Sequence, residues 1–386
     1  MYKIKINKAS LANFINRNIK RSFVLFKRIT HNRFNSTYYA DLLGLNLNRL
    51  LKNEFVPNPK EHIYIETTNI CNLGCKFCAY SKASTKKTAM SNKKFFEIVN
   101  NATEAGYDTF GLTPIVGEVF VDKNFIQKLN FLENHKKVKN YHFFTNFTLG
   151  NKEIVDALLK FKKLKELFIS LYGHDKESFM KFTGGSESVY NNLIENLEYL
   201  SNQLKNKSLD FELGFGLRTY RSFNSLDECT SKLCQILKDI LNNTRRSHLN
   251  ITKLYYNWGG YITQDDVEGL EITINKPTKY YKCGLCSLIL YKNQILADGR
   301  INACACRDVD ATLEIGDLNT QRFEEIYSIK NKKYIDIIKS QQNGYFNPVC
   351  RDCDFYRSIY KYYKVYHKYK RKLFCLNDFY ASLNRD

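Results

Sequence analysis

The chain has 386 residues, of which 44% are hydrophobic and 14% aromatic, so it is not intrinsically disordered and has room for about two or three domains. Its 59 lysines and arginines against 39 aspartates and glutamates give a formal net charge of +20, which favours acidic partners but does not fix the fold. Because no apolar run approaches about 18 residues, we expect neither a membrane-spanning helix nor a signal peptide.

Residues 1–60 are predicted to form a basic helical extension. The first 40 residues hold nine lysines or arginines and no acidic residue, and apolar side chains recur at helical spacing between Leu11 and Phe26. We expect a helix that packs on its own protein. Peripheral contact with an anionic membrane and an organelle transit segment are the alternatives. A second helix is predicted over residues 39–51.

Residues 61–276 alternate short apolar strands with amphipathic helices. Strands are predicted near 62–67, 108–113, 140–145, 166–171, 210–217 and 251–256. Helices are predicted over 93–105, 124–137, 152–162, 188–204 and 226–241. Six such repeats predict an α/β fold with a parallel sheet and right-handed crossovers. The functional site should then lie at the C-terminal ends of the strands.

Nine of the twelve cysteines fall into close groups. Such spacing favours ligation of a metal or cluster in a reducing compartment, so we expect a cytoplasmic protein. Cys71, Cys75 and Cys78 directly follow the first predicted strand. Three thiolates are one short of completing a tetrahedral zinc site or of binding all four irons of a cubane cluster. The number of cysteines alone therefore does not decide between zinc and an iron-sulfur cluster.

The CxxxCxxC spacing, with Phe77 before the last cysteine, resembles the radical S-adenosylmethionine (SAM) superfamily. The resemblance implies a partial (β/α)6 TIM-like barrel and a [4Fe-4S] cluster on Cys71, Cys75 and Cys78. It also implies that the fourth iron binds SAM. Reductive cleavage of SAM would then give a 5'-deoxyadenosyl radical that abstracts a hydrogen atom from the substrate.

Gly117 and Glu118 resemble the glycine-glutamate motif with which this superfamily contacts the SAM amino group. The match is partial, because Val116 stands where a glycine is usual and Val119 where a proline often follows. A carboxylate can accept a hydrogen bond from an ammonium, which suits Glu118 to this role. An ordinary solvated loop carboxylate is the alternative.

Further SAM contacts are implied at the ends of later strands. Asn146 belongs to a Thr-Asn pair that resembles the end of the third strand in the family, and Ser170 stands where a serine commonly reaches the SAM ribose. Arg218 is expected to pair with the SAM carboxylate, with a surface salt bridge as the alternative. Trp258, the only tryptophan, is either a pocket wall or a core residue.

Residues 277–355 change in character. A strand over 288–297, a turn at Asp298 and Gly299 and a returning strand over 300–304 predict a hairpin, and a helical stretch follows over 323–340. Cysteines flank these elements. The pattern resembles the auxiliary-cluster extension called SPASM, or its shorter relative twitch, and implies a second [4Fe-4S] cluster. Its ligands would be Cys286, Cys304, Cys350 and Cys353.

The sequence does not decide the roles of two cysteines in this region. Cys283 also satisfies the loose spacing, so it is the alternative to Cys286. Cys306 is left over; it is a candidate catalytic residue as a hydrogen-atom donor, a substitute ligand, or a spare thiol. A four-cysteine zinc ribbon is the alternative for the module as a whole. Residues 356–386, rich in tyrosine and lysine, are predicted to form a C-terminal helix.

We therefore expect an enzyme that abstracts hydrogen from a small-molecule or glycan-linked substrate, in a dehydrogenation or an epimerisation. Modification of a peptide or protein is the first alternative. A non-catalytic, basic, zinc-containing nucleic-acid-binding protein is the second, and we expect nucleic acid not to be a partner. An acidic flavodoxin or ferredoxin would suit the positive charge as reductant.

Overall fold

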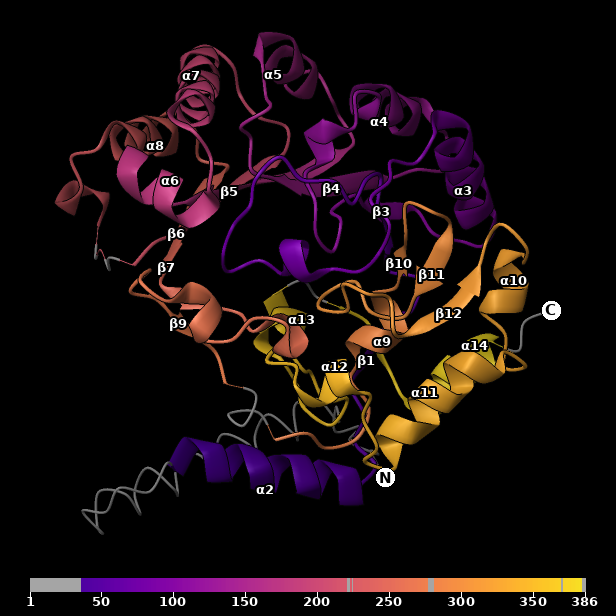
Figure 1. The fold of residues 1–386 in the computed structure, drawn as a ribbon. Helices are drawn as coiled ribbons and strands as arrows, with labels where there is room; N and C mark the ends of the chain where they lie inside the picture. The colour runs from indigo at the N-terminus through magenta and orange to yellow at the C-terminus, as the bar shows by residue number, and fades with distance from the viewer. Residues whose placement is uncertain (1–35, 221–222, 224, 277–280, 369–370, 384–386) are drawn as a thin grey trace, which may run out of the picture.

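The computed structural model describes residues 36–220, 223, 225–276, 281–368 and 371–383 (Figure 1). The predicted N-terminal helix between Leu11 and Phe26 lies outside these residues. In the described part the main sheet has the strand order β12-β11-β10-β2-β3-β4-β5-β6-β7. The pairs from β10-β2 through β6-β7 are parallel, and β10, β11 and β12 pair antiparallel. The sheet is therefore a partial barrel, open between β7 and β12.

The strands of this sheet are β2 (Ile63–Ile65), β3 (Thr109–Gly111), β4 (Asn140–Thr145), β5 (Leu164–Tyr172), β6 (Glu212–Arg218), β7 (Ser247–Thr252), β10 (Gln294–Ile295), β11 (Arg300–Asn302) and β12 (Glu314–Asp317). Two small sheets pair β1 (Val56–Pro57) with β13 (Leu373–Phe374), and β8 (Leu254–Tyr255) with β9 (Thr273–Ile274).

Helices cover the outer face of the barrel strands (Figure 1). They are α3 (Asn92–Glu104), α4 (Phe125–Asn134), α5 (Lys152–Leu158), α6 (Lys176–Thr183), α7 (Glu187–Leu204) and α8 (Lys232–Asn243). The alternation of side chains along β4 explains this arrangement. Phe143 is fully buried, with its ring 5.1 Å from that of Phe125 on α4, whereas the next residue, Phe144, is 40% exposed on the inner face.

The helix α6 was not predicted from the sequence. Asp175 and Ser178 form a capping box at its start, and Gly184 ends it in a left-handed conformation with φ of 66°. These are ordinary start and stop signals for a helix. With only eight residues between them, the apolar periodicity is too short to stand out.

The sixth barrel strand was predicted about four residues too late. The strand that pairs with β6 is β7, and the expected 251–256 segment divides between its end and β8, which belongs to another sheet. The Thr252 hydroxyl accepts a hydrogen bond from the Leu254 amide at 3.0 Å, and the chain turns there. A side-chain bond to the backbone competes with the strand ladder, so the apolar pattern alone misplaces the boundary.

The C-terminal module continues the barrel sheet. Its hairpin strand β10 lies parallel to β2, with Gln294 opposite Tyr64. The predicted strand over 288–297 is wrong in its first half, which forms the helix α9 (Leu288–Tyr291). All four of its residues are buried, and a short, wholly apolar run does not distinguish a buried helix from a buried strand. The helices α10 (Phe323–Ile326), α11 (Lys332–Gln342) and α12 (Pro348–Arg351) follow.

The tail forms two short helices rather than the single predicted one, namely α13 (Lys364–Lys368) and α14 (Leu376–Leu383), with β13 between them. The predicted helix over 39–51 is present as α2 (Ser36–Leu50). Asn48 of α2 donates to the Tyr360 carbonyl at 2.9 Å, so this helix is tied to the tail. None of the helices in the described residues is long and apolar enough to cross a membrane.

Candidate functional site

The loop that carries the first cysteine group starts at the C-terminal end of β2. Main-chain hydrogen bonds from Gly74 to the Thr183 carbonyl, at 2.9 Å, and from Lys76 to the Phe182 carbonyl, at 3.2 Å, fasten it to the end of α6. Cys75 is buried, and Cys71 and Cys78 are half-buried. The short helix α6 therefore anchors the loop on both sides of its second cysteine, Cys75.

Burial makes these thiols poor acids on their own. It raises the pKa of Cys71 to about 12 and raises the pKa of Cys75 and of Cys78, and the proximity of Cys78 and Cys71 raises that of Cys75 further. None of the twelve cysteines forms a disulfide. Three neighbouring, desolvated thiols can be ionised together only beside a strong positive charge such as a metal centre. The donor set therefore fits an iron-sulfur cluster.

Glu118 is buried, so the expected alternative of a solvated carboxylate is wrong. Its carboxylate accepts hydrogen bonds from the Thr145 hydroxyl and the Asn146 amide, both at 2.6 Å. Burial raises the pKa of Glu118 to about 7. The Asn146 side chain donates to Asn72, between the first two cysteines, at 3.0 Å. The predicted residues Glu118 and Asn146 are thus brought together with the cysteine loop.

Gly117 allows the loop after β3 to lie against the end of β2. Its φ is 141°, and a Cβ atom there would lie 3.0 Å from the Thr68 carbonyl oxygen. A side chain would therefore push the loop away from the cysteines. The two valines that depart from the family pattern, Val116 and Val119, are both buried.

The ends of β5 and β6 place the remaining predicted SAM contacts side by side. Ser170 lies opposite Gly216, and Tyr172 lies opposite Arg218. The Arg218 guanidinium is 5.9 Å from the centre of the Tyr172 ring, and the Phe77 ring is 5.0 Å from the same ring. Tyr172, which sequence reasoning did not single out, thus joins the cysteine loop to Arg218.

The second cysteine group surrounds a cavity of the C-terminal module. Five cysteines line it, together with Arg307 and Asp308 among others: Cys286, Cys304, Cys306, Cys350 and Cys353. Cys283 is not among the lining residues. Its main chain is held elsewhere, where the Tyr356 hydroxyl donates to the Cys283 carbonyl at 2.8 Å. The placement thus favours Cys286 over Cys283 as a ligand.

Cys304 and Cys306 form a hydrogen-bonded pair within this cavity. The bond lowers the pKa of Cys306 to about 6 and raises that of Cys304, while burial raises the pKa of Cys353 to about 12. Among the described residues, no three histidine, cysteine or acidic side chains converge on one metal-ion position. Thiols arranged around a cavity suit a cluster, in which each thiolate binds a different iron.

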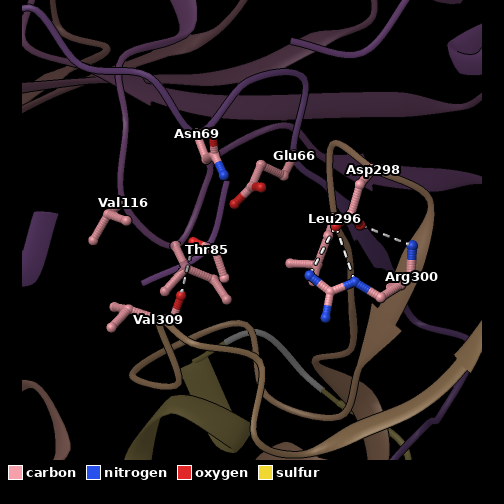
Figure 2. A pocket seen from close by; sticks show the side chains of 9 residues that line it. Glu66, Asn69, Thr85, Val116, Leu296, Asp298, Arg300 and Val309 are labelled. Atoms are coloured by element: carbon pink, nitrogen blue, oxygen red, sulfur yellow. Dashed lines mark hydrogen bonds and ion pairs between the residues drawn. The ribbon is translucent and has the colours of Figure 1, made fainter. Parts of the chain in front are cut away.

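A small pocket adjoins the end of β2, where the barrel meets the hairpin of the C-terminal module (Figure 2). Glu66 contributes a buried carboxyl group that accepts a hydrogen bond from the Ala297 amide at 3.3 Å. Burial raises the pKa of Glu66 to about 7. Asp298 and Arg300 lie across the pocket as an ion pair at 2.8 Å. Nothing in the sequence pattern marked Glu66, because its burial depends on the β10-β2 contact.

Two family models match the chain. One describes the radical SAM superfamily and matches residues 65–227; the other describes SPASM, an iron-sulfur cluster-binding domain, and matches residues 286–354. Together they span more than half of the sequence. The chain belongs to the radical SAM superfamily and carries a SPASM domain. Members of this superfamily are enzymes, and the two domains imply iron-sulfur clusters and SAM binding.

An uncharacterized protein of Methanocaldococcus jannaschii, MJ0804, is 31% identical over 150 residues, which cover 39% of this chain and 46% of that relative. The match thus spans less than half of the relative's length. Solved structures with a similar fold include BtrN in complex with AdoMet and 2-DOIA (10% identity, TM-score 0.49, covering 77% of this chain and 94% of BtrN). Another is SuiB of Streptococcus suis bound to the precursor peptide SuiA (17% identity, TM-score 0.45, covering 81% of this chain and 70% of SuiB).

Proposed function

We propose that the protein is a two-cluster radical SAM enzyme that abstracts hydrogen from a small-molecule or glycan-linked substrate, in a dehydrogenation or an epimerisation. The observation that carries the proposal is the parallel pairing of β10 with β2. It joins the module that holds the five-cysteine cavity to the strand that leads into the Cys71, Cys75 and Cys78 loop. A substrate in the barrel would then have a cysteine group on either side.

The three cysteines of the loop would hold a [4Fe-4S] cluster, which when bound supplies one-electron cleavage of SAM. In this proposal the residues of the chain orient the SAM molecule. Glu118 accepts hydrogen bonds from its ammonium, Ser170 binds its ribose and Arg218 pairs with its carboxylate. Asn146 and Gly117 keep the loops that carry these groups close to the cysteines.

The cavity would hold a second [4Fe-4S] cluster on Cys286, Cys304, Cys350 and Cys353, which when bound supplies a one-electron acceptor. Cys306, which also lines the cavity, is then free for a second role. In an epimerisation its thiol would return a hydrogen atom to the substrate. The other role proposed for Cys306 is that of a substitute cluster ligand.

The inner wall of the barrel supports a compact substrate. Phe144 stacks on Phe168 with ring centres 4.6 Å apart, and the Phe168 ring fills the space over Gly214, where a Cβ atom would approach it to 2.5 Å. At the other end of the strands the tail crosses the start of β2, where Arg371 pairs with Glu61 at 3.0 Å. An aromatic wall with one end covered suits a small ring or a sugar better than an extended chain.

Deuterium transfer tests this proposal. The reconstituted enzyme would be incubated without oxygen with SAM, reductant and deuterated candidates, small polyols and sugars in one set and peptides in the other. We expect deuterium in 5'-deoxyadenosine from a member of the first set. Transfer from a peptide alone would replace the proposal with the peptide-modifying alternative.

We also propose an acidic flavodoxin or ferredoxin as the electron donor. A net charge of +20 attracts such proteins at long range, and salt screens that attraction. The rate of electron delivery should therefore fall as ionic strength rises. A rate that is indifferent to salt would contradict an electrostatic docking of the donor.

A further inference from the structure

Arg307 places a fixed positive charge on the wall of the five-cysteine cavity. Its side chain is only 11% exposed. The guanidinium carbon lies 4.3 Å from the centre of the Tyr256 ring, 4.8 Å from that of Phe355 and 5.2 Å from that of Trp258. Three ring faces hold the guanidinium in place, so its charge has a defined position relative to the cysteines.

The charge of Arg307 is only loosely neutralised. Its Nε lies 3.5 Å from Oδ1 of the buried Asp354, and neither atom makes a hydrogen bond with the described residues. The other carboxylate oxygen of Asp354 accepts from the Asn257 amide at 2.9 Å. The buried pair of Lys128 and Asp122 is different, because there the ammonium donates directly to the carboxylate.

Two further basic residues lie near this cavity. The Arg357 guanidinium carbon is 4.7 Å from the centre of the ring of Phe355, which lines the cavity. The Lys292 carbonyl accepts from the Ala305 amide at 2.9 Å, which fixes its main chain beside the Cys304 and Cys306 turn. Arg307 is thus the basic residue among those that line the cavity, together with the five cysteines.

We propose that Arg307 raises the reduction potential of the auxiliary cluster. The inference rests on the proposed function, because it requires a cluster on these cysteines. Reduction adds one negative charge to a thiolate-bound cluster, and a nearby fixed cation in a poorly solvated site stabilises that extra charge. Arg307 therefore acts on the cluster through its fixed charge and makes the cluster easier to reduce.

The test uses the full chain with Cys71, Cys75 and Cys78 replaced by alanine, so that only the auxiliary cluster can form. Arg307→Gln, Arg307→Lys and a control, Arg351→Gln, are added to this parent. Arg351 neighbours Cys350 in sequence, but its side chain is 67% exposed and pairs with Asp352 at 2.9 Å. Each protein is titrated with redox mediators, and the reduced cluster is followed by electron paramagnetic resonance.

We expect Arg307→Gln to lower the ratio of reduced to oxidised cluster about tenfold at a given solution potential. This corresponds to a reduction potential lower by about 59 mV for one electron. Arg307→Lys and Arg351→Gln should stay near the parent. Loss of the cluster in Arg307→Gln but not in Arg307→Lys would replace the inference with a role for the charge in cluster assembly.

Three further results would overturn the inference. An iron-loaded Arg307→Gln protein whose cluster has the same reduction potential as the parent would overturn only this inference and leave the proposed function intact. A shift or a loss of cluster that is equal in Arg307→Gln and Arg307→Lys would assign Arg307 a packing role. A parent that binds no iron on the cavity cysteines would overturn both this inference and the proposed auxiliary cluster.

Discussion

The indole nitrogen of Trp258 donates a hydrogen bond to the main-chain carbonyl of Phe77 at 3.0 Å. Phe77 lies between the second and third cysteines of the first group. The residue before Trp258, Asn257, donates through its side chain to the Asp352 carbonyl at 2.6 Å, between Cys350 and Cys353. The segment η4 (Trp258–Gly260) and its cap therefore connect the two cysteine groups, and Trp258 does so in addition to the core packing that was one of its two expected roles.

Replacing Trp258 with phenylalanine should loosen the first cysteine loop. The change keeps an aromatic ring but removes the N–H donor, and a net loss of about 1 kcal/mol corresponds to roughly fivefold faster opening of the loop. We expect a chelator to remove the SAM-responsive paramagnetic signal about that much faster. An unchanged rate would mean that the hydrogen bond does not stabilise the loop.

Replacing Glu118 with glutamine should weaken SAM binding about tenfold, because a charge-assisted hydrogen bond to the ammonium is lost. The pKa of Glu118 is raised to about 7, and the ionised form is the one that binds an ammonium. Binding to the unmodified protein should therefore tighten as pH rises through about 7, and this dependence should be absent in the variant.

Thr145→Val is the matched control for Glu118, because it removes a hydrogen bond to the same carboxylate and leaves the charge. Calorimetric titration of SAM into each reconstituted protein measures the effect. The assignment of Glu118 to the ammonium is contradicted by a glutamine variant that retains both the affinity and the pH dependence.

Glu66 should make folding stability depend on pH in a recognisable way. Burial raises the pKa of this carboxyl group from 4.5 to about 7. Between these values the unfolded chain releases a proton that the folded chain keeps, so the contribution of Glu66 falls as pH rises and is constant above about pH 7. Glu66→Gln removes it. The difference in urea midpoint between Glu66→Gln and the unmodified protein should therefore grow in favour of the variant from about pH 5 to about pH 7. A difference that does not change with pH would contradict the burial argument.

Phe144→Ala should impair the substrate reaction and spare the cleavage of SAM in the absence of substrate. The side chain is 40% exposed on the inner barrel face, where a substrate would contact it. Met180, 38% exposed on the outer helix α6, gives a control of similar exposure in Met180→Ala. Product analysis with and without substrate separates the two activities. Equal effects of both replacements would argue against an aromatic substrate wall.

Local sequence signals predicted much of the barrel. The alternation of strands and helices and the cysteine spacing are patterns among a few neighbouring residues, so they can be recognised without a structure. For this reason the segments of β4 and α3 were predicted to within a residue or so. Asn146 directly follows β4, as the sequence predicted, whereas Ser170 lies two residues before the end of β5.

Features that depend on distant segments were not predicted. The pairing of β10 with β2 joins residues more than 200 positions apart, and it buries Glu66 and brings the hairpin to the barrel. The arrangement of Arg307 on Tyr256, Trp258 and Phe355 likewise needs three separate segments. Such contacts follow from tertiary packing, which overrides short-range propensity in α9 as well.

The most direct measurement is the cleavage of SAM by the anaerobically reconstituted protein in the presence of dithionite. The account predicts 5'-deoxyadenosine and methionine in equal amounts, and none of either from a variant in which Cys71, Cys75 and Cys78 are alanine. An iron-loaded protein that leaves SAM intact, or a triple variant as active as its parent, would contradict it.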